Sequence, residues 1–207
     1  YVGGSFTSLG LGATASEAIG AWNDGAGTWG AMDGLSNGGF FVNIVRSISL
    51  SGTKVFICAE NVESPSAGVA YWDTGTSDWH AMGTGFSGSG QGYSSAVLGD
   101  YIYFGGNFTD ANSVANTANL ARWNITGAAF ESIDGGGANG NVLSMTVVNG
   151  TDLVIGGAFT TVGAGALSAA KIAGWNNGIW SLLGTGLNNT CYALTSYNEN
   201  IGAGGTF

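Results

Sequence analysis

The sequence predicts an all-β protein, a β-propeller built from four-stranded blades of about 51 residues each. The first observation is a tryptophan that recurs at intervals of 50, 51 and 52 residues. The second is the motif Gly-Gly-x-Phe, which recurs upstream of this tryptophan and again at the end of the chain. The third is that no segment shows the sustained periodicity of an amphipathic helix. A right-handed solenoid of stacked strands is the structural alternative, but its repeats are usually shorter.

Each repeat carries the same markers in the same order. The recurring tryptophan ends a short apolar run, a second aromatic residue follows five or seven places later, and an apolar patch with glycine comes next. The tryptophans are Trp22, Trp72, Trp123 and Trp175, and the second aromatic residues are Trp29, Trp79, Phe130 and Trp180. Complete Gly-Gly-x-Phe motifs start at Gly3, Gly105, Gly156 and Gly204, whereas the second repeat has Cys58-Ala59-Glu60-Asn61-Val62.

The paired glycines predict close approach between neighbouring blades. Glycine inside a strand weakens the strand, so it usually marks a place where another backbone comes near. The inner strands of a propeller crowd toward the axis, and we expect a Cβ at these glycines to clash with the next blade. The phenylalanine two positions further on is expected to fill the space between the sheets.

The repeat that starts at Asn141 shows the four predicted strands of a unit. They are 142–148, 153–159, 171–175 and 179–183. Asn149-Gly150 supplies a two-residue turn that suits a tight hairpin, and Asn176-Asn177-Gly178 supplies another.

The repeats divide a single propeller segment, 1–207, at approximately 1–40, 41–90, 91–140, 141–190 and 191–207. The first repeat lacks its first strand, and the last holds only its first two. Strand 192–197 could complete the first blade as its innermost strand, but 201–207 would then compete with 1–6 for one place. We therefore expect either a longer propeller of five to eight blades or pairing of the redundant strand with another chain, because an exposed strand edge is a template for pairing. Head-to-tail pairing that does not close makes filaments.

The composition excludes several classes of protein. Only 8% of the residues are charged, 39 are glycine and one is proline, while aromatic residues make up 12%, so a disordered chain and a collagen are excluded. Four basic residues against thirteen acidic ones give a net charge of −9, which leaves no basic surface for nucleic acid or for an interfacial membrane helix. No apolar run is long enough to span a membrane. The chain opens without a targeting signal, so we expect a mature or truncated start.

The aromatic pairs and the single histidine are predicted to be structural. Aromatic faces suit sugar rings, but pairs that recur in every blade on strands facing adjacent sheets indicate core packing. His80 follows Trp79 at a position that Gly30, Glu131 and Ser181 occupy in the other repeats, so we expect a solvated strand position there. A zinc site would need His80, Cys58 and Cys191 to converge from different blades, and we do not expect one.

The two cysteines and the acidic residues give no catalytic pattern. Cys58 and Cys191 lie nearly three repeats apart, so we expect two buried thiols or unrelated partners, with a mutual disulfide as the alternative. Asp33 and Asp134 hold equivalent positions, and Asp73 lies in a turn, where Asp caps backbone groups. A propeller glycosidase would need paired carboxylates near the axis, and no strand carries two in line. The glycine-rich segment 134–141 lacks the Asp-x-Asp spacing of a calcium loop. We expect no catalytic residue, metal or cofactor.

Four Asn-x-Thr sequons are candidate N-glycosylation sites: Asn149, Asn188, Asn124 and Asn107. Their number is what the composition gives by chance, so their placement carries the prediction. Asn149, Asn188 and Asn124 lie at predicted turns or blade connections, where a glycan can project. Asn107 lies in a predicted strand and comes last.

The order Gly-Gly-x-Phe, apolar-Ala-x-Trp-Asn/Asp and Trp-x-x-Leu-Gly-x-Gly resembles kelch-like secreted β-propeller repeats, and more closely those related to the fungal cortical polarity-marker proteins and to bacterial surface propellers. The resemblance covers all 207 residues and rests on structural positions, so it implies fold and location more than activity. The second repeat departs from it at 58–62. A copper oxidase of the kelch fold would need two histidine ligands, and this chain has one.

The residues and this resemblance lead to one functional hypothesis and one alternative. We expect a non-enzymatic extracellular or cell-surface glycoprotein, a structural scaffold or filament subunit whose partners are copies of itself, with glycans as a further partner. The alternative is a carbohydrate-binding or carbohydrate-processing propeller.

Overall fold

The computed structural model describes residues 1–10, 12, 14–32, 43–60 and 66–207. These residues form β-strands, turns and loops, with no α-helix among them, so the predicted all-β class is confirmed. The described part of the chain accordingly contains no helix of the length and apolarity needed to cross a membrane.

Three antiparallel four-stranded sheets form the middle of the molecule. In the second and third sheets the four strands are consecutive along the chain, and in the fourth a short hairpin lies between the second and third strands. The second sheet contains β6 (Ile44–Ser51), β7 (Lys54–Glu60), β8 (Val69–Asp73) and β9 (Asp78–Ala81). The third contains β10 (Gln91–Leu98), β11 (Tyr101–Asn107), β12 (Leu120–Asn124) and β13 (Ala129–Glu131). The fourth contains β14 (Val142–Val148), β15 (Asp152–Gly157), β18 (Ile172–Asn176) and β19 (Ile179–Leu182).

Two smaller sheets flank them. The first sheet contains β1 (Val2–Gly3), β4 (Ile19–Asn23) and β5 (Thr28–Ala31), and the fifth contains β20 (Cys191–Tyr197) and β21 (Asn200–Gly205). β20 pairs with β21 and not with β1, so the innermost strand of the last repeat does not complete the first sheet. Each sheet lies within one predicted repeat, and the boundary at 40/41 lies outside the described residues.

Two short hairpins sit beside the sheets and were not predicted from the sequence. β2 (Ser8–Leu9) pairs with β3 (Thr14–Ala15), and β16 (Thr161–Val162) pairs with β17 (Leu167–Ser168). Both lie between the second and third strands of a repeat, where the sequence gives only glycine-rich connections.

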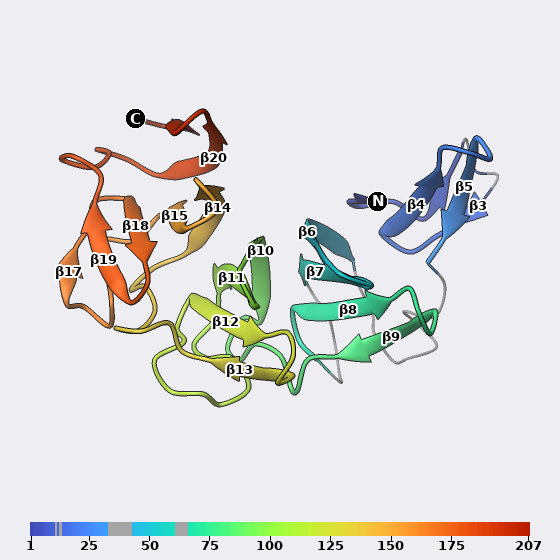
Figure 1. Cartoon of the computed structure of the whole chain (residues 1–207), viewed down its shortest axis with the longest axis horizontal. Helices are drawn as coiled ribbons and strands as arrows, with labels where there is room; N and C mark the ends of the chain where they lie inside the picture. The colour runs from blue at the N-terminus through green and yellow to red at the C-terminus, as the bar shows by residue number, and fades with distance from the viewer. Residues whose placement is uncertain (11, 13, 33–42, 61–65) are drawn as a thin grey trace.

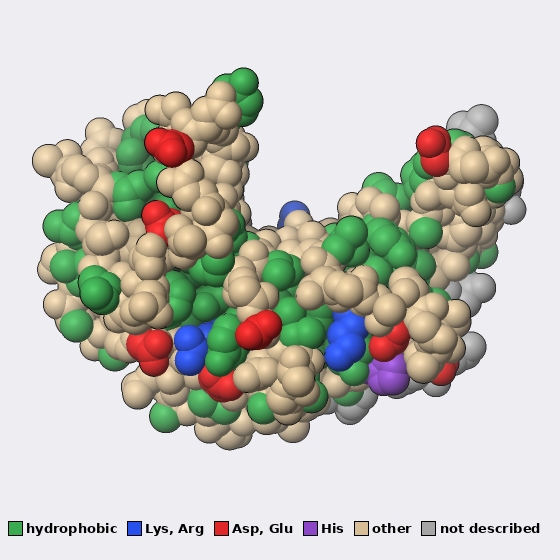
Figure 2. Space-filling view, viewed as in Figure 1, with side chains coloured by type: hydrophobic (Ala, Val, Ile, Leu, Met, Phe, Trp, Pro, Cys, Tyr) green, Lys and Arg blue, Asp and Glu red, His purple; other side chains and the backbone are tan. Residues whose placement is uncertain are grey.

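The sheets follow one another around an open arc (Figure 1). The first strands of successive repeats, β6, β10, β14 and β20, contact one another in that order along the inner side of the arc. The first and fifth sheets lie on opposite sides of a wide notch, which the space-filling view shows as open (Figure 2). The described strands therefore do not close into a ring.

The predicted unit at Asn141 matches the fourth sheet closely. The first strand has the predicted bounds 142–148, and the other three agree to within two residues at either end. Asn149 and Gly150 both have positive φ, 53° and 71°, as a two-residue hairpin turn requires. In the second repeat, β7 is regular and pairs on both edges despite its different sequence, while Asn61 and Val62 lie outside the described residues.

The recurring aromatic residues form four cross-strand pairs, and three of these pairs pack on the preceding sheet. Each aromatic pair joins the third and fourth strands of a sheet: Trp22 with Trp29, Trp72 with Trp79, Trp123 with Phe130, and Trp175 with Trp180. The pair of the second sheet packs in a cluster with Ile19 and Met32, that of the third with Val69 and Met82, and that of the fourth with Leu120 and Ile133. The predicted core role is therefore confirmed for these three pairs.

The paired glycines lie where one sheet meets the next. A Cβ built on Gly105 would be 2.5 Å from Val142 Cγ1, and one on Gly156 would be 2.7 Å from Cys191 Sγ. Such distances are too short for real atoms, so the predicted clash is confirmed. Phe108 and Phe159, which end these motifs, are buried in the clusters between sheets, as predicted.

Candidate functional site

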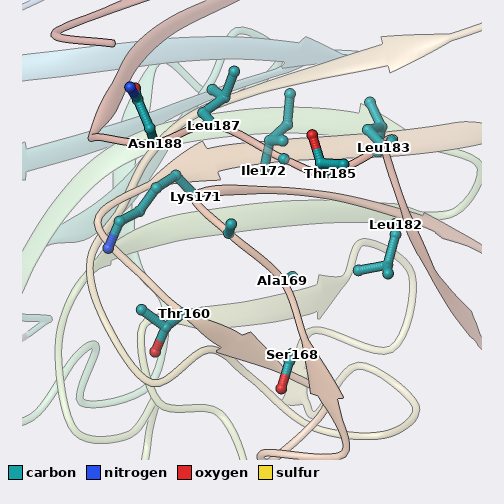
Figure 3. A pocket seen from close by; sticks show the side chains of 13 residues that line it. Thr160, Ser168, Ala169, Lys171, Ile172, Leu182, Leu183, Thr185, Leu187 and Asn188 are labelled. Atoms are coloured by element: carbon teal, nitrogen blue, oxygen red, sulfur yellow. The ribbon is translucent and has the colours of Figure 1, made fainter.

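The last complete sheet carries an apolar groove on the face that looks toward the fifth sheet. Two cavities of ≈ 440 and ≈ 260 Å³ meet at Leu182 and Leu183, and together we call them the fourth-sheet groove. Val154 lines the smaller cavity and Ile172 the larger. In Figure 3, Leu187, Ile172 and Leu183 lie along one side of the larger cavity, and Thr160 and Ser168 lie on the opposite side.

Polar groups rim this groove, and several of them are already engaged. Lys171 Nζ donates a hydrogen bond of 3.1 Å to the backbone carbonyl of Ala158. Asp152 Oδ1 accepts a hydrogen bond from Asn176 Nδ2, and Asp152 and Glu199 both line the smaller cavity. An apolar floor with a polar rim suits a flat apolar or aromatic group better than a charged one.

The repeats show why the groove exists. Leu183 follows Trp180 by three places, as Met32, Met82 and Ile133 follow the second aromatic residues of the first three sheets. Those three side chains are buried, whereas Leu183 is half-buried and its neighbour Leu182 is exposed. The aromatic pair of the next sheet covers this position in the other repeats, and the two-stranded fifth sheet contains no third and fourth strand to carry such a pair.

In the first sheet it is the aromatic pair itself that is partly exposed. Trp22 and Trp29 are edge-to-face with ring centroids 5.1 Å apart, much like Trp72 and Trp79 at 5.6 Å. The side chain of Trp22 is 47% exposed, whereas the equivalent Trp123 and Trp175 are buried. The prediction that every aromatic pair is core is therefore wrong for this one, because the described residues hold no sheet that precedes the first.

Basic and aromatic side chains lie next to one another on the second, third and fourth strands of the second sheet, and on the second and third strands of the third sheet. His80 stacks on Tyr71 with ring centroids 4.9 Å apart, and Lys54 Nζ lies 5.0 Å from the centre of the same ring. Burial, and then the nearby Asp73 carboxylate, raise the pKa of Tyr71. The predicted solvated position of His80 is therefore a half-buried stacking position instead.

The third sheet carries an ion-pair network at the equivalent place. Arg122 forms ion pairs with Glu131 at 3.1 Å and Asp134 at 3.7 Å, and its guanidinium lies 4.4 Å from the ring centre of Tyr101. Asp33, the predicted counterpart of Asp134, lies outside the described residues.

Turn residues cap the backbone as predicted. Asp73 Oδ1 accepts a hydrogen bond of 2.8 Å from the Gly75 N–H, and this bond is the main cause of a lowered pKa for the carboxyl of Asp73. Asn124 Oδ1 accepts one of 2.7 Å from the Gly127 N–H. In the glycine-rich segment 134–141, Asn139 Oδ1 accepts hydrogen bonds from the backbone N–H groups of Thr160 and Thr161. Within the described ranges, no three His, Cys, Asp or Glu side chains are grouped so as to hold a metal ion.

The two cysteines are buried free thiols in different sheets, as predicted. Cys58 on β7 donates a hydrogen bond of 3.3 Å to the backbone carbonyl of Ser94 on the next sheet. Burial raises the pKa of both thiols, so both remain protonated at neutral pH.

The four sequon asparagines occupy different environments. Asn149, in the turn between β14 and β15, and Asn188, at the rim of the larger cavity, are exposed. Asn124 and Asn107 are the last residues of β12 and β11 and are half-buried. Asn124 Nδ2 is also hydrogen-bonded to Glu131 at 3.3 Å. The two exposed asparagines, Asn149 and Asn188, are those predicted to be modified first.

Sequence reasoning missed the fourth-sheet groove, although a signal was present. Aligning the repeats places Leu183 at a position that needs an aromatic cover from the following repeat, and the segment 191–207 contains no tryptophan.

Comparison with solved structures finds chains of similar fold. One is the structure described as the crystal structure of the computationally designed Ika4 protein, with a TM-score of 0.52 and 13% sequence identity. The match covers 77% of this chain and 84% of that one. No family model matches the chain, and no curated protein matches it. At this identity the similarity is one of fold alone.

Proposed function

We propose that the sheets are blades of a kelch-like β-propeller and that the protein is a non-enzymatic extracellular or cell-surface component, a scaffold or filament subunit that acts through its surfaces. The observation that carries the proposal is the contact between successive sheets, which is built three times from an aromatic pair packed on the preceding sheet. A unit that cannot bury its faces alone is stabilised by stacking on like units.

The use of the polar side chains supports a structural role. Arg122 is bound to Glu131 and Asp134, Asp73 caps its own turn, and Asn139 ties two loops together. These groups stabilise backbone and sheet edges and do not converge on a common point of the surface.

Two exposed sequons support the proposed extracellular location. Asn149 and Asn188 project from a turn and a connection, where an attached glycan would meet solvent. Mass spectrometry of peptides from native material, with and without removal of N-linked glycans, tests occupancy. We expect modification at these two positions before Asn124 and Asn107.

Negative-stain electron microscopy of native, unconcentrated material tests the structural role. Regular assemblies with a constant repeat distance are the expected result. Dispersed single particles would contradict the role of filament subunit.

Carbohydrate binding is the second candidate, because two observations favour it. Trp22 presents a partly bare indole, and Asp152 and Glu199 line one cavity of the fourth-sheet groove. A glycan array tests this candidate directly. Binding that is lost in Asp152→Asn and retained in Asp100→Asn, a substitution in the turn between β10 and β11, would favour it over the structural role.

A further inference from the structure

We propose that Asn149 and Asn177 are sites of spontaneous deamidation in the folded protein, and that Asn139 is protected from it. All three asparagines precede a glycine. A fourth asparagine with a following glycine, Asn37, lies outside the described residues. The inference goes beyond the proposed function and does not depend on it, because it concerns the chemistry of turns and loops inside the repeats.

Deamidation of an Asn-Gly pair needs only water as a co-reactant, and asparagine is a chemically labile residue for this reason. The backbone nitrogen of the glycine loses its proton and attacks the side-chain carbon Cγ of the asparagine, so an N–Cγ bond forms. The Cγ–Nδ2 bond then breaks, the leaving nitrogen takes up a proton, and ammonia departs from the cyclic succinimide. Water opens the ring at either carbonyl and gives aspartate or isoaspartate. Glycine favours the attack because it has no side chain to hinder the approach and its backbone turns freely.

The two open pairs lie in exposed hairpin turns. Asn149-Gly150 joins β14 to β15, and Asn177-Gly178 joins β18 to β19. A Cβ built on Gly150 would meet no atom within 4 Å, and one on Gly178 would meet only the side chain of Asp134, at 3.7 Å. Within the described part of the chain, neither asparagine side chain is held by hydrogen bonds. The glycine nitrogen and Cγ therefore have room to approach each other.

Hairpin turns are exposed in the third sheet as well, which has a four-stranded sheet on either side. Gly99 and Asp100, between β10 and β11, are exposed, and so are residues 126–128, between β12 and β13. The exposure of Asn149 and Asn177 therefore follows from the place of these turns at the ends of the strands.

Asn139 is also exposed, but its side chain is held. Its Oδ1 accepts hydrogen bonds of 2.8 and 2.9 Å from the backbone N–H groups of Thr160 and Thr161, and its Nδ2 donates one of 2.8 Å to Thr160 Oγ1. A Cβ built on Gly140 would lie 3.1 Å from Phe159 Cα, so the backbone beside the reacting nitrogen is packed. These three hydrogen bonds must break before the ring can close at this position.

The reaction at Asn149 also removes a candidate glycosylation site. An N-linked glycan is attached to Nδ2, the atom that leaves as ammonia, so the two modifications exclude each other. Asn177-Gly178-Ile179 and Asn139-Gly140-Asn141 are not sequons, and these two positions therefore report on deamidation alone.

At Asn149, deamidation adds negative charge where it is already present. Asn149 lines one cavity together with Asp152 and Glu199, so the new carboxylate would face like charges. Isoaspartate also routes the main chain through Cγ, which lengthens a turn whose length sets the register of the hairpin.

Ageing of the unmodified chain, folded and unfolded, tests the proposal. The protein is kept in mildly alkaline buffer with and without urea, and circular dichroism confirms that it is folded in the first case. Peptide mass spectrometry follows the conversion of amide to acid at each position. In the folded chain Asn149 and Asn177 should convert at least about tenfold faster than Asn139, because three hydrogen bonds hold Asn139. In urea the three rates should become similar, since each asparagine then differs little from the others in its surroundings.

Two valine substitutions test the cause of the protection. Thr160→Val removes the hydroxyl that accepts the hydrogen bond from Asn139 Nδ2, so conversion at Asn139 should become roughly twofold to tenfold faster. Thr161→Val is the matched control, because it keeps the backbone N–H that bonds Asn139, and the rate should stay unchanged. Asn149→Gln should abolish conversion at that position, since the longer side chain closes such a ring far less readily.

Three results would contradict the proposal. Equal rates at the three positions in the folded chain would overturn it. Intact Asn149 and Asn177 in the folded chain, with conversion only in urea, would show that the turns protect them as well. An unchanged rate at Asn139 in Thr160→Val would overturn the role of its hydrogen bonds. None of these results depends on whether the chain forms assemblies, so the proposed function is tested separately.

Discussion

The contact between the second and third sheets and the contact between the third and fourth each place a glycine opposite a larger residue. The glycine lies on the first strand of the later sheet in one contact and on the second strand of the earlier sheet in the other. In the later contact, Gly105 on the second strand of one sheet receives Val142 from the first strand of the next. In the earlier contact, the second strand carries Cys58, and the facing first-strand residue is Gly92, whose built Cβ would lie 3.0 Å from Cys58 Cβ. The repeat therefore preserves the combined volume of two facing residues and not the glycine itself. The altered motif of the second repeat is compensated by a residue 34 places further along the chain.

The largest expected loss of stability comes from adding one methyl group at the contact between the third and fourth sheets. Gly105→Ala would place its Cβ 2.5 Å from Val142 Cγ1 and 2.7 Å from Ser94 Oγ, so we expect the free energy of unfolding to fall by roughly 2–3 kcal/mol. Urea denaturation followed by tryptophan fluorescence measures this.

The matched control for that substitution is Gly204→Ala. Gly204 holds the equivalent position on β21, where a Cβ would meet only Ala193 Cβ at 3.8 Å among the described residues. Its effect should be within about 0.5 kcal/mol. Equal losses in the two variants would show that strand propensity, and not the contact between sheets, sets the cost.

Exchanging the facing residues of the earlier contact should sharpen the comparison. Gly92→Val alone forces side-chain atoms into Cys58 and should cost about 1–3 kcal/mol. Adding Cys58→Gly restores the glycine-with-valine order of the contact between the third and fourth sheets and should recover part of that loss. Recovery should be incomplete because the Cβ at position 92 would still lie 2.9 Å from the Gly68 carbonyl oxygen. A double-mutant cycle measures the coupling, and strictly additive losses would contradict the interpretation.

The thiol at this contact predicts a loss of stability in alkali. Burial raises the pKa of Cys58 above its ordinary value, so the native thiol stays protonated while the unfolded chain loses the proton above about pH 8.5. The stability is therefore fully present below that pH and falls above it by up to about 1.4 kcal/mol per pH unit for each such thiol. Denaturation midpoints between neutral pH and about pH 9.5 test this. Cys58→Ala should make the decline shallower, and an unchanged slope would assign the effect to other groups.

The smallest effects are expected at three equivalent serines. Ser47 Oγ accepts a hydrogen bond of 3.1 Å from the Ser95 N–H of the next sheet, and Ser144 Oγ accepts one of 2.9 Å from the Leu194 N–H. Ser94, the counterpart between them, has a buried hydroxyl oxygen without a partner in the described part of the chain. Ser144→Ala should therefore cost about 1 kcal/mol, whereas Ser94→Ala should be neutral or slightly stabilising. The same denaturation assay tests both, and a larger loss for Ser94→Ala would reverse the assignment.

Much of the fold could be predicted because local chemistry sets it. Asn149-Gly150 favours positive φ on its own, and the β-branched and apolar residues of 142–148 favour a strand without help from distant parts of the chain. The compensation of Cys58 by Gly92 could not be predicted, since it depends on the register between two sheets. The same holds for the groove at Leu183 and for the exposure of Trp22, which depend on which neighbouring sheet is present.

The ion pairs of the described residues all stay within a single repeat. Arg46 pairs with Glu60 inside the second sheet, and Arg122 pairs with Glu131 and Asp134 in and beside the third. Apolar side chains and hydroxyl groups, such as Ser47 with Ser95, make the contacts between sheets. Added salt should therefore have little effect on the interactions between neighbouring sheets. It should also screen the electrostatic repulsion within a chain of net charge −9. The stacked sheets should therefore be at least as stable in high salt as in dilute buffer.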